Sequence, residues 1–99
     1  MALEISVAFP PSRAAIDHAV MAEKLGYKRA WFYDSPALYP DVWVVLALVA
    51  ERTSTIELGP ATLIPHLRHP MTQAAAIATL VEMAPGRLAV ALGDRKSVV

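Results

Sequence analysis

Segments of strand character alternate with segments of helical character along the chain, and this alternation is the strongest constraint on its fold. Apolar and aromatic runs typical of strands occupy 3–9, 27–34, 55–62 and 87–92. Apolar residues at helical steps of three and four recur over 13–25, 42–53 and 71–83. The expected order is β-α-β-α-β-α-β with short connections, which indicates an α/β fold built on a parallel sheet.

Residues that favour the ends of helices and strands support these boundaries. Ser12 and Asp41 each stand where a helix N-cap is expected, and Gly26 suits the left-handed position after a helix. Pro70 fits the first turn of the third helix, where the fixed φ of proline is tolerated. The Gly59-Pro60 pair lies within the third strand, and proline has no N–H for a central ladder. We therefore expect that strand to bend or bulge at its C-terminal end.

Two topologies are compatible with this order. Right-handed crossovers between neighbouring strands place all three helices on one side of the sheet, which is how a (β/α) barrel begins. A doubly wound sheet would place helices on both sides. Periodicity alone does not separate the two.

Composition excludes several classes of function. Nine basic and nine acidic residues cancel, so no net field attracts nucleic acid or an anionic membrane. The absence of cysteine excludes disulfides and thiolate metal sites. The longest apolar run covers residues 42–50, about half of what a membrane span needs. No phosphate-binding glycine loop is present, and we expect a soluble, cytoplasmic protein.

Three ordered stretches resemble the luciferase-like monooxygenase superfamily, especially its deazaflavin-dependent members related to methylenetetrahydromethanopterin reductase. They read AEKLGYKRAWFYDSPALYPDVWVVLALVAERTSTIELGPATLIP, then RHP at 68–70, then AAAIATLVEMAPGRLAVALG, and span most of residues 22–93. The resemblance implies a TIM-type (β/α)8 barrel with one cofactor site at the C-terminal ends of the strands. It also implies homo-oligomers formed through the second and third helices.

The resemblance assigns site residues to the ends of the second and third strands. Asp34 and Ser35 match an acidic or polar pair near the flavin ring. Ala61 and Thr62 match a bulge in the third strand that often carries a non-proline cis peptide and backs the ring. Ile64 falls at a position that is often polar in the family.

The fourth strand contributes the last two assigned residues. Gly93 and Asp94 match the start of a Gly-x-Gly loop, although Arg95 replaces the second glycine. Residues 1–93 are thus interpreted as the N-terminal portion of a barrel, and 94–99 as a tail that departs from the family pattern. A complete barrel takes about 250 residues, so this portion is expected to be incomplete and inactive alone.

The chemistry implied for the parent enzyme is hydride transfer between coenzyme F420, a deazaflavin, or alternatively FMN, and a small organic substrate. An FMN-dependent monooxygenase parent and a non-catalytic, self-associating βα fragment are the alternatives.

Other conspicuous side chains have simpler interpretations. His18 is expected on a helix surface, and His66 and His69 lack further ligands for a metal site. Solvation at the start of the third helix is at least as good an explanation for Arg68 and His69 as contact with a cofactor or substrate. Trp31 and Phe32 are expected to be core aromatics.

Overall fold

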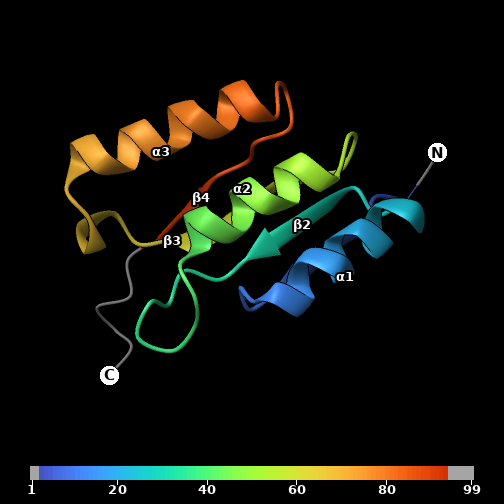
Figure 1. The fold of residues 1–99 in the computed structure, drawn as a ribbon, viewed down its shortest axis with the longest axis horizontal. Helices are drawn as coiled ribbons and strands as arrows, with labels where there is room; N and C mark the ends of the chain where they lie inside the picture. The colour runs from blue at the N-terminus through green and yellow to red at the C-terminus, as the bar shows by residue number, and fades with distance from the viewer. Residues whose placement is uncertain (1–2, 94–99) are drawn as a thin grey trace.

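The computed structural model describes residues 3–93, which form four parallel strands and three α-helices (Figure 1). The elements follow the expected order: β1 (Ser6–Phe9), α1 (Arg13–Lys24), β2 (Arg29–Phe32), α2 (Val42–Arg52), β3 (Glu57–Leu63), the 3-10 turn η1 (Pro65–Leu67), α3 (Pro70–Met83) and β4 (Ala91–Leu92). The strand order β1-β2-β3-β4 is sequential. Helix α2 packs between α1 and α3. This arrangement is the start of a barrel and excludes the doubly wound alternative.

The helix ends form as the sequence predicts. The Ser12 hydroxyl accepts the Ala15 N–H at 3.0 Å, and Asp41 Oδ2 accepts the Val44 N–H at 3.0 Å. Gly26 follows α1 with φ of 88°, a conformation that costs an L side chain about 1–2 kcal/mol.

The hydrophobic core lies between the sheet and the helices. Ala30 and Phe32 alternate with half-buried residues along β2, and both are completely buried. They belong to one buried cluster with Leu46 from α2 and Leu58 from β3. Phe32 was expected in this core, and it lies there.

The opposite face of the sheet is not covered by any helix among the described residues. Register aligns Arg29 of β2 with Glu57 of β3, and the two form an ion pair at 2.6 Å. The Arg29 guanidinium also lies 5.3 Å from the centre of the Trp31 ring. Trp31 is only half-buried, so the expectation that it joins the core is wrong: strand alternation turns it away from the helices.

The fourth strand is much shorter than the expected 87–92. Leu58 accepts the Ala89 N–H at 3.0 Å and donates its own N–H to the Arg87 carbonyl at 2.9 Å. Two residues further along β3, Pro60 has no N–H to continue the ladder. Regular pairing resumes with Ala61 opposite Ala91, and the register then shifts before Leu63 pairs with Leu92. The irregularity expected at the end of this strand is therefore confirmed.

At the N-terminal edge of the sheet, the Glu23 carboxylate and the Arg87 guanidinium both bind the α2–β3 connection. Glu23 Oε2 accepts the N–H groups of Ser54, Thr55 and Ile56 at 2.6–3.1 Å. Arg87 donates to the Ala50, Thr53 and Ile56 carbonyls and to the Thr53 hydroxyl. The connection is thus fixed before β3 begins.

Candidate cofactor site

A cleft of about 450 Å³ opens at the C-terminal edge of the strands. Its lining comes from the ends of β2, β3 and β4 and from the β2–α2 loop: Tyr33, Asp34, Ser35, Leu38, Tyr39, Ala61, Thr62 and Gly93. The C-terminal edge is where barrel enzymes build their sites, because the loops that follow the strands meet there.

Small residues form the β3–β4 side of the cleft. The Ala61-Thr62 peptide bond is cis, as the resemblance implied. Gly93 lies beside Thr62, and a Cβ added at Gly93 would fall 2.1 Å from Thr62 Cγ2. The Gly93 N–H also donates to the Leu63 carbonyl at 3.1 Å. A larger residue at position 93 would therefore displace Thr62 or fill the cleft.

Aromatic side chains from the end of β2 and from the β2–α2 loop also line the cleft. The rings of Tyr33 and Tyr39 lie 6.3 Å apart at an interplanar angle of 45°. Tyr33 follows directly after β2, and Tyr39 lies in the loop that leads to α2. Sequence reasoning did not assign either tyrosine or Leu38 to the site. Their positions could have indicated this role. Both tyrosines lie in the segment that follows β2, and the segments that follow parallel strands meet at the C-terminal edge of the sheet.

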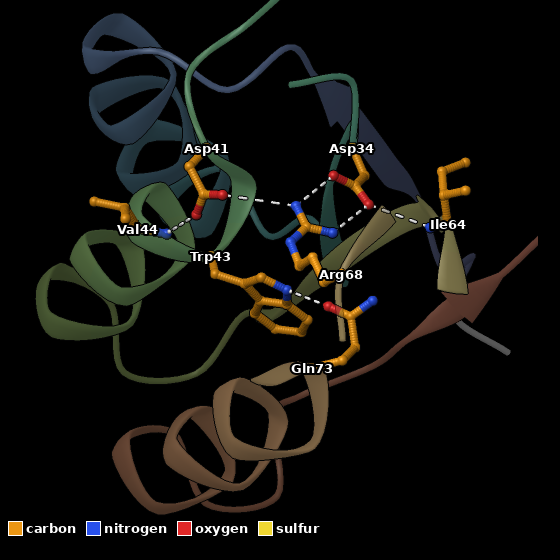
Figure 2. Close-up of polar contacts among 7 residues, drawn as sticks. All are labelled: Asp34, Asp41, Trp43, Val44, Ile64, Arg68 and Gln73. Atoms are coloured by element: carbon orange, nitrogen blue, oxygen red, sulfur yellow. Dashed lines mark hydrogen bonds and ion pairs between the residues drawn. The ribbon is translucent and has the colours of Figure 1, made fainter. Parts of the chain in front are cut away.

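Asp34 lines the cleft and takes part in a network of polar contacts (Figure 2). Its Oδ1 accepts from Arg68 Nη2 at 2.7 Å, and its Oδ2 accepts from Arg68 Nη1 at 2.8 Å. Oδ2 also accepts the backbone N–H of Ile64 at 3.2 Å. Only 1% of the Asp34 side chain is exposed. The carboxylate is thus held by three donors from the segment that follows β3.

Arg68 is the cation of this network. Its guanidinium also lies 3.6 Å from Asp41, the N-cap of α2. Hydrogen bonding to Asp34 raises the pKa of Arg68 above its usual value, against the opposing effect of burial. Solvation at the start of α3 is therefore the wrong interpretation of Arg68, because its fork-shaped guanidinium matches the buried carboxylate. No local sequence pattern indicates this partner, which lies 34 positions away.

A second polar contact ties α3 to α2 nearby. The Trp43 indole N–H donates to Gln73 Oε1 at 2.8 Å, and both side chains are buried (Figure 2). Together with the Arg68 contacts, this bond fixes the start of α3 next to the start of α2.

Five of the seven predicted site residues meet in the cleft: Asp34, Ser35, Ala61, Thr62 and Gly93. Ile64 does not line it. The Ile64 side chain is buried, and its backbone contributes instead through the bond to Asp34. Asp94 lies outside the described residues.

The histidines lie apart from this cleft. His18 is exposed on α1, as expected, with its ring 5.8 Å from that of Phe9. His69 Nδ1 accepts the Met71 N–H at 3.1 Å and so caps α3. Within residues 3–93, no group of three or more potential metal ligands is assembled.

The profile of the luciferase-like monooxygenase family matches residues 3–98. The chain belongs to this family. An F420-dependent glucose-6-phosphate dehydrogenase of Kineococcus radiotolerans is 39% identical over 98 residues, which cover 91% of this chain and 29% of that protein.

Two solved structures extend the comparison. The coenzyme F420-dependent tetrahydromethanopterin reductase of Methanopyrus kandleri matches 96% of this chain with a TM-score of 0.83 and 32% identity. The oxygenating constituent of 3,6-diketocamphane monooxygenase from Pseudomonas putida, in complex with FMN, matches 94% with a TM-score of 0.79 and 26% identity. The chain covers 28% and 30% of those two chains, respectively. Its four-stranded parallel unit therefore corresponds to part of a luciferase-like barrel.

Proposed function

We propose that this chain supplies the ring-facing part of the cofactor site in an oxidoreductase that uses coenzyme F420 or FMN. The observation that carries the proposal is the cleft, where predicted residues from the ends of three strands meet. Relatives that use F420 and a neighbour with bound FMN support both cofactors. The substrate proposed is a small organic molecule.

The residues of the cleft fit a planar heterocycle. A volume of about 450 Å³ falls within the range of ligand sites in proteins. Ala61, Thr62 and Gly93 offer a surface of small residues, and Tyr33 and Tyr39 add aromatic rings to the lining. A bound deazaflavin or flavin would supply the hydride acceptor or donor. The chain's own residues would support one face of the ring and exclude water from it.

We further propose that the 99-residue chain does not turn over substrate by itself. The sheet face opposite the helices is uncovered in the described residues, and a complete barrel closes that face with eight strands. A cofactor would therefore be held by only part of its site, and its binding should be weak. An FMN-dependent monooxygenase parent stays an alternative, which the FMN-bound neighbour favours.

Titration of the whole chain with FMN and with F420, followed by amide NMR, tests the proposal. We expect shifts at Ala61, Thr62 and Gly93 but not at Ser54, which lies at the opposite edge of the sheet. Ala61→Leu should fill the cleft and weaken these shifts, whereas Ala14→Leu on the exposed face of α1 should not.

The possible outcomes separate the two claims. No shift with either cofactor would overturn the proposed site. Tight binding that leaves the purified chain coloured, or substrate turnover, would overturn only the claim that the chain is inactive alone.

A cytoplasmic location and the dimer through α2 and α3 stay predictions. None of the helices in the described part of the chain is long and apolar enough to cross a bilayer.

A further inference from the structure

The Asp34 carboxylate has little capacity left for a ligand. Three donors already occupy its two oxygens, and two of them come from one planar guanidinium. Bidentate pairing of this kind fixes both distance and orientation. Although Asp34 lines the cleft, its side chain is oriented by Arg68 and Ile64.

Arg68 joins segments that are far apart in the sequence. It contacts Asp34 at the end of β2 and Asp41 at the start of α2. Arg68 itself lies between η1 and α3, immediately before the α3 cap His69. The ends of the elements around the cleft thus converge on one guanidinium (Figure 2).

We propose that Asp34 and Arg68 are a positioning pair, which fixes the end of β3 against the end of β2 and so sets the width of the cleft. Ile64 is the link, because its N–H is bound by Asp34 and it lies two residues after Thr62. The intervening Leu63 is completely buried and cannot absorb a shift without repacking. The role of the pair toward a cofactor rests on the function proposed above, whereas its role in fixing Ile64 does not.

An exposed ion pair in the same chain provides a matched control. Arg52 Nη1 lies 2.7 Å from Asp17 Oδ1, the same separation as between Arg68 Nη2 and Asp34 Oδ1. The Arg52 and Asp17 side chains are 52% and 69% exposed, against 14% and 1% for Arg68 and Asp34. Parallel substitutions at the two arginines therefore separate the effect of the buried network from the loss of a positive charge.

The experiment compares Arg68→Lys, Arg68→Met and Asp34→Asn with Arg52→Lys and Arg52→Met, all in the whole chain. Amide hydrogen exchange is followed at Ile64 and at Leu58. The Leu58 N–H donates to the Arg87 carbonyl, which is independent of the network. The FMN concentration at half-maximal shift of Thr62 is measured in parallel.

For the Arg68 and Asp34 variants we expect exchange at Ile64 to rise about tenfold or more, with Leu58 nearly unchanged. Lysine cannot reproduce the two-pronged contact, so Arg68→Lys should not restore protection. The FMN midpoint should rise in the same variants, and the Arg52 variants should match the unaltered chain. If Arg68→Met does not fold, Arg68→Lys carries the test.

Equal loss of protection at Ile64 and Leu58 would show a role in global stability and overturn the proposal. Wild-type protection of Ile64 in Arg68→Lys would also overturn it. If FMN binds the unaltered chain nowhere, the proposed function fails, and selective exchange at Ile64 still decides whether the pair fixes that residue.

Discussion

Burial and the number of hydrogen-bond donors decide what each charged residue does in this chain. The Asp17–Arg52 pair lies in solvent, where such a contact contributes about 0–1 kcal/mol. The Asp34–Arg68 pair has the same shortest separation but is buried, so removing either partner would leave the other charge buried and unpaired. Glu23 resembles neither pair, because its donors are three backbone N–H groups and the Thr55 hydroxyl rather than a guanidinium. Residue type alone does not distinguish these three roles.

Glu23→Gln should lower the free energy of unfolding at pH 7 by about 1.5–3 kcal/mol, the usual contribution of a hydrogen bond to a charged group. Burial raises the pKa of Glu23, but hydrogen bonds from Thr55, Ser54 and Ile56 outweigh this effect and lower it from 4.5 to about 2. The stabilisation is therefore complete above pH 4.5 and disappears as the pH falls toward 2.

Urea unfolding of both proteins between pH 7 and pH 2 measures this difference. The gap between wild type and Glu23→Gln should close in acid. A constant gap across that range would contradict the assignment, and Glu51→Gln, at an exposed position of α2, serves as the control.

At the scale of elements, the connections on the N-terminal edge serve stability and those on the C-terminal edge form the cleft. Helix spacing and the N-caps Ser12 and Asp41 were predictable, because they depend on local hydrogen bonds and periodicity. The length of β4 was not predictable from the sequence. It depends on which β3 residues present an N–H to it, and Pro60 presents none.

Arg87→Met should lower the melting temperature clearly more than Arg52→Met. Arg87 binds carbonyls at the end of α2 and in the α2–β3 connection, which would otherwise lose their partners. Thermal unfolding followed by circular dichroism checks this order. Equal effects of the two substitutions would show that the Arg87 contacts stabilise the fold no more than the exposed Arg52 pair does.

Gly59→Ala should be strongly destabilising, because a Cβ at Gly59 would fall 1.5 Å from the Ala89 carbonyl oxygen. That oxygen is backbone, so the segment that leads into β4 would have to move away from β3. A Cβ at Gly26 would meet no neighbouring atom. Gly26→Ala should therefore lower the free energy of unfolding by only about 1–2 kcal/mol, the cost of a left-handed backbone for an L residue. Chemical denaturation compares the two, and a smaller loss at Gly59 would contradict the close packing of β3 and β4.

At the scale of the whole molecule, apolar residues remain exposed on helices α2 and α3. Val44 and Leu48 of α2 are 62% and 48% exposed, and Met71 and Val81 of α3 are 75% and 50% exposed. Exposed apolar surface of this kind suits contact with another protein surface. The uncovered sheet face around Trp31 is the competing surface for self-association.

We expect the chain to self-associate through α2 and α3. The double substitution Val44→Glu/Leu48→Glu should shift it toward monomer in sedimentation velocity, because burying two carboxylates opposes association. Met21→Glu, at an exposed position of α1, is the control. If Trp31→Ala dissociates the assembly and the helix substitutions do not, the open sheet face is the interface.

The sequence by itself determined the order of elements, the helix caps, the irregular end of β3 and most residues of the cleft. These follow from periodicity, from the chemistry of single residues, and from ordered motifs that resemble a family. Only the tertiary structure decided that Arg68 pairs with Asp34, that Tyr33 and Tyr39 complete the cleft, and that Ile64 acts through its backbone. Such contacts join distant segments, and they depend on strand register and burial, which local sequence does not encode.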